Sequence, residues 1–258
     1  MPPLFDLAKT NPELVVLVHG TKDSAGQHLI RQGVLKLAEY LQARLRIAWL
    51  ECLEPTLDEV LLDCAQNNKH VIILPLLLFR AGHAKKDLPA ALERVTLQFP
   101  NFSSDVASVV GDAEIMLGCW KPAFERLDPE RDRVCFFGRG AKDPEALEAC
   151  QNVILRLREI WPGKWLEAYA GLQKPSLPDA LVNQPFHGGQ QLFIPCLLFK
   201  GLLLDQAQEQ TASLGSWLPV LGELPEFLFA TARRWRQEIQ DFGVQTGRAE
   251  KTKNRVLS

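Results

Sequence analysis

The chain has 258 residues, of which 47% are hydrophobic and 23% are charged, and these proportions are ordinary for a soluble globular protein. Its formal net charge of -2 gives no electrostatic reason to expect nucleic acid or an anionic membrane as a partner. The longest apolar run, Val71 to Phe79, is far shorter than the ~20 residues of a membrane span, and the amino-terminal segment lacks the pattern of a secretory signal, so we expect a cytoplasmic protein.

Short apolar runs alternate with helical patterns along the chain, which is typical of buried parallel strands joined by helices. In the first half we predict strands at 14–18, 46–50, 71–77 and 107–110 and helices at 26–44, 57–65 and 86–97. In the second half we predict strands at 134–137, 165–168, 192–197 and 218–221 and helices at 144–160, 178–183, 204–213 and 225–240. From Val244 onward the apolar period stops, and we predict a frayed basic end.

A shift of 120 residues aligns the two halves in four separate segments. It places HGTKD on RGAKD, QGVLKL on NVILRL, EPTLDEVL on KPSLPDAL, and VIILPLLLF on the segment that ends in IPCLLF. Because one shift serves all four segments, we predict an α/β fold of two tandem parallel-sheet sandwich domains related by an internal duplication. The predicted limits are 1–127 for the first domain, 128–243 for the second and 244–258 for a basic tail.

The pair His19-Gly20 at the end of the first predicted strand is compatible with more than one kind of α/β enzyme. In an α/β-hydrolase such a loop supplies an oxyanion-hole amide, but that chemistry also needs a G-x-S-x-G elbow and a histidine late in the chain. The sequence has no G-x-S-x-G, and no histidine follows Ser213 of its nearest look-alike, TASLG. A phosphate-binding turn in HGTKDSAG is a further alternative, although it leaves the rest of the pattern unexplained. The hydrolase interpretation fails.

Three polar residues, His19, Glu51 and His83, follow the first three predicted strands. Because the carboxyl ends of parallel strands meet at one edge of a sheet, we expect these residues to share a cleft. Two imidazoles and a carboxylate suit Co²⁺, Fe²⁺, Ni²⁺ or Zn²⁺, and so few protein ligands leave the ion exchangeable. Glu54 competes with Glu51 for the carboxylate role. The six cysteines include no C-x-x-C pair, which argues against structural zinc or an iron–sulfur cluster.

The internal repeat separates the candidate ligands from the framework. The residues that correspond to the three candidates in the second half are Arg139, Gly171 and Leu203. Framework residues are kept, since Gly20 and Asp23 correspond to Gly140 and Asp143. We therefore expect the first half to carry the chemistry and the second half to close the cleft.

The segments LVHGTKD, WLECLEPTLDEVL and ILPLLLFRAGHAKKDLP resemble the motifs of the sirohydrochlorin chelatases of the CbiX/SirB type, which are class II chelatases. Long members of that family are tandem duplications, as this chain is. The resemblance implies a lyase that inserts Co²⁺ or Fe²⁺, with Ni²⁺ as a further candidate, into the tetrapyrrole sirohydrochlorin on the way to cobalamin or sirohaem. It also implies metal binding by His19 and His83 and an assisting role for Glu51. Val18 departs from the family, which usually has glycine there.

The implied substrate carries many carboxylates, so basic side chains are expected at the rim of the cleft. The candidates are Lys22, Arg80, Lys85 and Lys86, with Arg139 and Lys200 facing them from the second half. The metal is a substrate, and no organic cofactor is implied. Because both halves lie in one chain, a monomer with its cleft between the halves is sufficient. A non-catalytic tetrapyrrole or metal carrier of the same fold is the alternative, and the sequence leaves open the metal, the pathway and the oligomeric state.

Overall fold

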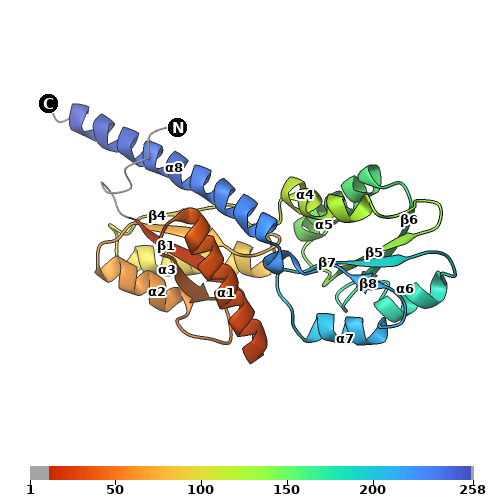
Figure 1. Cartoon of the computed structure of the whole chain (residues 1–258). Coiled ribbons are helices and arrows are strands. Elements are labelled where there is room, and N and C mark those ends of the chain that lie inside the picture. Colours follow the sequence, from red (N-terminus) through yellow and green to blue (C-terminus); the bar gives the residue numbers. More distant parts are fainter. Residues whose placement is uncertain (1–11, 257–258) are drawn as a thin grey trace.

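The computed structural model describes residues 12–256, apart from the side chains of residues 83, 84 and 244–256, and it has two lobes (Figure 1). Each lobe contains one four-stranded parallel sheet, with the orders β2-β1-β3-β4 and β6-β5-β7-β8. The strands of the first lobe are β1 (Glu13–Val18), β2 (Arg46–Trp49), β3 (Val71–Pro75) and β4 (Ser104–Val106). Those of the second lobe are β5 (Arg133–Gly138), β6 (Lys164–Tyr169), β7 (Gln191–Cys196) and β8 (Ser216–Trp217). The predicted fold class, two parallel-sheet α/β units, is confirmed.

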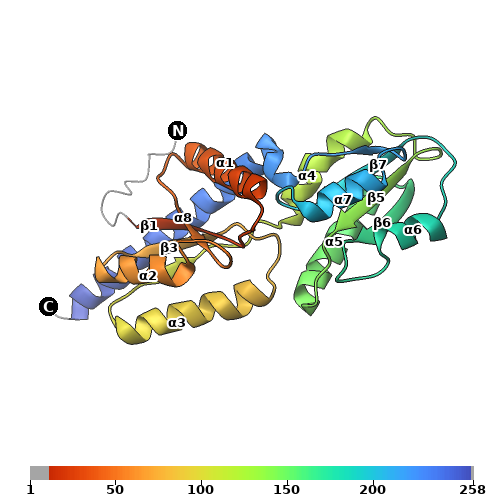
Figure 2. The ribbon, with the colours of Figure 1, turned by 90° about the horizontal axis from the view of Figure 1, so that it is seen from below.

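Helices cover both faces of each sheet, as Figure 2 shows for the first lobe. In that half the helices are α1 (Ser24–Leu41), α2 (Leu57–Gln66), the π-helical turn η2 (His83–Asp87), α3 (Leu88–Gln98) and α4 (Ala113–Phe124). The second half has α5 (Pro144–Ile160), α6 (Leu177–Asn183), α7 (Leu202–Gln210), the 3-10 turn η3 (Leu221–Glu223) and α8 (Pro225–Val256). Within the described range, no helix is long and apolar enough to cross a membrane.

The central strand β1 is buried on both faces, which explains its unbroken apolar sequence. Leu14, Val16 and Val18 belong to the cluster shared with α1 and α8, whereas Val15 and Leu17 belong to the cluster shared with α2 and α3. A strand whose two faces are both covered cannot alternate with polar residues. This burial anchors the carboxyl end of β1, where His19 follows.

Equivalent helices of the two halves begin with equivalent caps. The Asp23 side chain accepts hydrogen bonds from first-turn amides of α1, and Asp143 does the same for α5. Thr56 caps α2 and Ser176 caps α6. Each such side chain satisfies amides that have no partner within the helix, at a typical gain of about 1 kcal/mol. The residues that the repeat keeps therefore fix where helices start.

The last helix of each half packs against the other lobe. Helix α4 follows the first sheet but lies against α5, where Arg156 forms an ion pair with Glu114. Helix α8 follows the second sheet but runs along α1 (Figure 1). The predicted limit near residue 127 therefore separates the two sheets in sequence. In space, however, α4 and α8 each pack against the lobe that contains the other sheet.

Three local predictions need correction, and one helix was missed. The strands predicted at 107–110 and 218–221 are β4 and β8, which lie earlier, at Ser104–Val106 and Ser216–Trp217. The pattern at 107–110 is apolar because Ala107 and Val110 join the cluster beneath α8, although their amides still donate to the carbonyls of Ile73 and Leu77 at 2.8 and 2.9 Å. Helix α4 was not predicted, and it carries Pro122 inside it, which normally breaks a helical pattern. The predicted frayed end is also wrong, since α8 continues to Val256.

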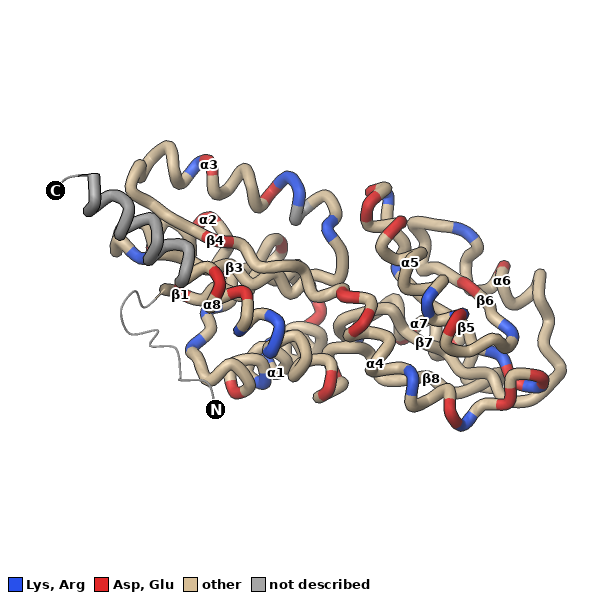
Figure 3. The backbone as a smooth tube through the Cα atoms, turned by 90° about the horizontal axis from the view of Figure 1, so that it is seen from above, with Lys and Arg blue, Asp and Glu red and all other residues tan. Residues whose placement is uncertain are grey.

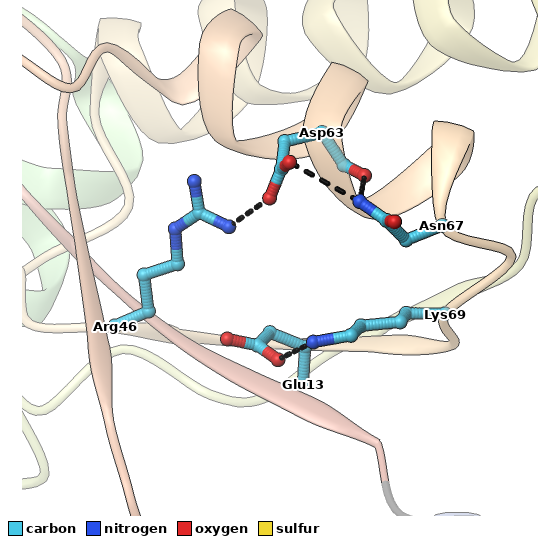
Figure 4. Close-up of polar contacts among 5 residues, drawn as sticks. All are labelled: Glu13, Arg46, Asp63, Asn67 and Lys69. Atoms are coloured by element: carbon cyan, nitrogen blue, oxygen red, sulfur yellow. Dashed lines mark hydrogen bonds and ion pairs between the residues drawn. The ribbon is translucent and has the colours of Figure 1, made fainter.

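Polar contacts connect the amino-terminal ends of β1 and β2 to α2 and the segment that follows it (Figure 4). Arg46 of β2 pairs with Asp63 of α2, and the Asn67 side-chain amide donates to the Asp63 carboxylate at 3.2 Å. Lys69 pairs with Glu13 of β1 at 2.7 Å. Solvent screens such partly exposed pairs, so they hold these segments together without dominating the stability of the lobe.

We expect Trp235→Ala in α8 to lower the free energy of unfolding by about 3–5 kcal/mol, because the change opens a cavity in the core. The Trp235 side chain is fully buried, and its Nε1 donates to the Ser108 carbonyl at 3.1 Å. Phe229 lies on the same helix and is 55% exposed, so Phe229→Ala is the matched control and should cost much less. Urea unfolding measures both, and equal losses would show that α8 is not held through its buried face.

Candidate functional site

The carboxyl ends of both sheets border a cavity of about 510 Å³ between the lobes. Its walls are mainly apolar and come from the segments that follow β3 and β7, residues 76–79 and 197–199, together with residues 202–204 at the start of α7. The volume and the apolar lining with few polar groups are typical of a small-molecule site. Residues of both halves line it, as the sequence predicts for a cleft that the second half closes.

His19 lies on the wall of this cavity, immediately after β1. The Leu50 amide donates to the Val18 carbonyl at 2.9 Å, and the Glu51 amide donates to the His19 carbonyl at 3.0 Å. The ladder between β1 and β2 therefore continues beyond the strands and sets Glu51 beside His19 along the backbone. The Glu51 side chain is exposed and is not among the cavity-lining residues that the structure describes.

Gly20 makes this close approach possible. Its φ is +99°, and a Cβ added there would lie 2.1 Å from the Glu51 carbonyl oxygen. Gly140 holds the corresponding place in the second lobe, with φ of +78°, and a Cβ there would meet Gln173 at 3.1 Å. The glycine that both halves keep is therefore required by backbone geometry on each side of the cavity.

His83 begins the π-helical turn that leads into α3, and its side chain lies outside the described part of the structure. Ala81, two residues earlier, lines the cavity, which puts this loop at the cavity edge. Among the side chains that are described, no group of three or more His, Cys, Asp or Glu could hold a metal ion. Metal binding by His19 and His83 therefore stays a prediction, as does the choice between Glu51 and Glu54.

The predicted basic residues of the first half have different surroundings. Lys22, Arg80 and Lys86 are exposed. Figure 3 shows basic residues in the segment ahead of α3, where Lys85 and Lys86 lie. The role of Lys22, Arg80 and Lys86 in binding substrate carboxylates is compatible with this exposure and stays a prediction.

Lys85 forms an ion pair that links the two lobes. Its Nζ lies 2.7 Å from Asp143 and 3.0 Å from Glu145, both at the start of α5. This pairing raises the pKa of Lys85 and lowers that of the Asp143 carboxyl. Lys85 is thus an interlobe contact here rather than an open cation for substrate.

Arg139 and Lys200 line the cavity from the second lobe, as the sequence predicts. Arg139 takes the place that His19 has in the first lobe, and the Lys200 Nζ lies 2.9 Å from Glu223. Two further lining residues of this lobe, Cys150 and Cys196, were not singled out from the sequence. The same shift of 120 residues contains the signal, since it places them on two apolar positions of the first half.

The model of the CbiX family matches residues 13–127. A sirohydrochlorin ferrochelatase of Bacillus subtilis is 28% identical over 182 residues, which cover 67% of this chain and 68% of that protein. A sirohydrochlorin cobaltochelatase of Priestia megaterium is 25% identical over 200 residues, which cover 74% of this chain and 65% of that protein. The chain thus matches about two thirds of the length of each of these curated relatives.

Solved structures show the same fold. SirB from Bacillus subtilis with Fe³⁺ superposes with a TM-score of 0.72 at 22% identity, over 88% of this chain and 94% of that one. CbiX, described as the terminal enzyme of sirohaem biosynthesis in denitrifying bacteria, superposes with a TM-score of 0.61 at 19% identity, over 86% of this chain and 98% of that one. The resemblance drawn from the three sequence motifs is confirmed.

We expect Gly20→Ala to lower the free energy of unfolding by about 1–3 kcal/mol, because the new Cβ would meet the Glu51 carbonyl in a strained backbone conformation. Gly118→Ala is the control. No atom lies within 4 Å of a Cβ added at Gly118 inside α4, so that change should be neutral or stabilising. Urea unfolding of both variants decides the matter, and a stable Gly20→Ala would mean that the turn can move.

We expect Lys85→Met to lower the free energy of unfolding at neutral pH and to lose this difference in acid. The pKa of Asp143 is lowered in the folded protein, so the pair stabilises above the usual carboxyl range and its effect disappears as the pH falls below about 4. The pKa of Lys85 is raised, so the effect also disappears only at strongly alkaline pH. Urea unfolding across this range measures the difference.

Asp143→Asn is the matched partner variant, because asparagine keeps the cap of α5 while removing the charge. The double variant with Lys85→Met should lose less than the sum of the two single losses. Strict additivity would show that the two side chains do not interact in solution.

Proposed function

Because the model of the CbiX family matches residues 13–127, we propose that the protein is a sirohydrochlorin metal chelatase, a lyase that inserts a divalent metal ion into sirohydrochlorin. The observation that carries the proposal is the cavity between the lobes, with apolar walls and with His19 at the carboxyl end of β1. A flat macrocycle needs two apolar surfaces, and each lobe supplies one. A metal ion needs a ligand that opens onto the same space, and His19 supplies it.

Metallation removes two pyrrole N–H protons while the metal exchanges its ligands. A neutral imidazole at His19 can hold the ion and, after releasing it, accept a proton near neutral pH. His83 is the proposed second metal ligand. Glu51, whose backbone neighbours that of His19, is the proposed assisting carboxylate, and Glu54 is its competitor. The metal itself is a substrate, and no organic cofactor is needed.

The carboxylates of the macrocycle require cations at the cavity edge. Arg139 and Lys200 line the cavity from the second lobe. Lys22, Arg80 and Lys86 are the proposed partners from the first lobe. Lys85 belongs to the same proposed set, but binding substrate would require it to leave Asp143 and Glu145.

We also propose residues 1–127 as the unit that carries the metal ligands and residues 128–243 as the unit that closes the cleft. Since one chain supplies both walls, a monomer is sufficient. Co²⁺ and Fe²⁺ suit the same nitrogen and oxygen ligands, with Ni²⁺ a further candidate, so the ligand set does not choose among them. Of the two curated relatives described above, one is named for iron and the other for cobalt.

The direct test is to mix the purified protein with sirohydrochlorin and Co²⁺ or Fe²⁺ without oxygen and to follow the tetrapyrrole spectrum. We expect a rate above the uncatalysed reaction with at least one of the two ions. A rate equal to the uncatalysed background would replace the chelatase by a tetrapyrrole or metal carrier of the same fold.

We expect His19→Ala and His83→Ala each to lower the metallation rate by at least about 100-fold, because a ligand and a proton acceptor are lost together. His187→Ala is the control, since this exposed histidine precedes β7 at the edge away from the cavity. The assay is the anaerobic spectral one. Wild-type rates in both active-half variants would show that the ligands are assigned wrongly.

A further inference from the structure

An ion pair with two acceptors joins the turn that carries His83 to the second lobe. The Lys85 Nζ lies 2.7 Å from the Asp143 carboxylate and 3.0 Å from that of Glu145. The side chains of Lys85 and Asp143 are 25% and 19% exposed, so water only partly screens the shorter contact. The pair therefore holds together two segments that are 58 positions apart in the sequence.

Both ends of this ion pair are attached to the cavity wall. In the first lobe, the Lys85 amide donates to the Ala81 carbonyl at 3.0 Å, and Ala81 lines the cavity. In the second lobe, the Asp143 carboxylate accepts from the Ala146 amide at 3.3 Å, and Ala146 lines the cavity too. The ion pair therefore restrains the separation between a wall of the first lobe and a wall of the second.

The turn that carries His83 is weakly packed. None of the described side chains from residue 80 to residue 87 is buried, and the first buried residue after them is Leu88. A Cβ added at Gly82 would meet no atom within 4 Å. Segments with few buried contacts are the ones that open at a low cost in free energy. A polar contact can therefore decide where this turn lies.

The equivalent position of the second lobe cannot form the same contact. The shift of 120 residues places Asp205 on Lys85 and Asp23 on Asp143. Asp23 caps α1 as Asp143 caps α5, but two carboxylates do not form an ion pair. That lobe also has leucine at the position of His83. Of the two equivalent turns, the one that carries the proposed metal ligand is therefore the one that has the contact.

We propose that Lys85 is a positioning residue for His83. Through its ion pair it holds the turn of residues 81–87 against the second lobe, and so sets where the proposed second metal ligand lies at the cavity edge. The turn includes a π-helical stretch, and such stretches are frequent at functional sites. This inference rests on the proposed function, and it gives Lys85 a role through the turn rather than through the carboxylates of the macrocycle.

Steady-state kinetics of the metallation reaction separate the two roles. Lys85→Met should lower kcat by about 10- to 100-fold and change the KM for sirohydrochlorin little, because a displaced ligand slows the chemical step. Lys85→Arg keeps the charge and should retain most of the rate. Asp143→Asn removes the charge of the partner but keeps the cap of α5, so it should lower kcat as Lys85→Met does.

Two kinetic results would overturn the proposal. A raised KM with an unchanged kcat in Lys85→Met would show that Lys85 binds the substrate directly. A lowered KM in Asp143→Asn would show the same, because that change frees the lysine for a carboxylate of the macrocycle.

Amide hydrogen exchange tests the restraint without any turnover. In Lys85→Met and in Asp143→Asn, residues 81–88 should exchange at least about 10-fold faster than in the wild type, while the amides of β1 keep their wild-type rates. Arg94→Met is the matched control, since Arg94 of α3 pairs with Asp58 of α2 inside the first lobe at 2.7 Å. It should leave exchange at residues 81–88 unchanged.

The two kinds of measurement keep this proposal distinct from the proposed function. Unchanged exchange at residues 81–88 in Lys85→Met and Asp143→Asn would overturn the positioning role even in an active chelatase. Faster exchange in those variants, combined with a wild type that does not metallate sirohydrochlorin, would support the restraint and refute the proposed function alone.

Discussion

The hydrogen bond from the Glu51 amide to the His19 carbonyl, 3.0 Å long, is the contact on which the candidate site depends. It extends the β1–β2 ladder one step past the strands and holds the turn after β1 against the turn after β2. Gly20 then has to adopt a positive φ with no side chain, because the Glu51 carbonyl occupies the space. Three residues later Asp23 caps α1. Ladder, glycine and cap together hold His19 at the wall of the cavity.

Apolar periodicity predicted the position of most strands and helices, including α8, but it misplaced β4 and missed α4. Ala107 and Val110 have the apolar content of a strand because α8 buries them, whereas the true strand Ser104–Val106 is a short, partly exposed edge. The same limit hid α4, whose apolar side packs on α5 and whose interior contains Pro122. Local sequence reports that a residue is buried, but not which element buries it.

The site also contains residues that the sequence predicted and residues that it did not. His19 was found because strand ends are predictable and parallel strands share an edge. The pairing of Lys85 with Asp143 was not, since the two residues are 58 positions apart and meet only when the lobes are placed relative to each other. Cys150 and Cys196 are also distant in sequence, and each taken alone is an ordinary buried thiol. Only a position-by-position comparison of the two halves shows that these cysteines take the places that Ile30 and Leu76 have in the first half.

The exchanged helices make the two halves dependent on each other. Helix α8 covers α1 of the first lobe, and α4 covers α5 of the second, so the first helix of each half lies between its own sheet and the last helix of the other half. This is the arrangement of a swapped dimer whose two copies have been joined into one polypeptide. The last helix of each half, α4 or α8, completes the packing of the other half. The two lobes that border the cavity are therefore held together by both exchanged helices, so a change that displaces either helix would also alter the cavity.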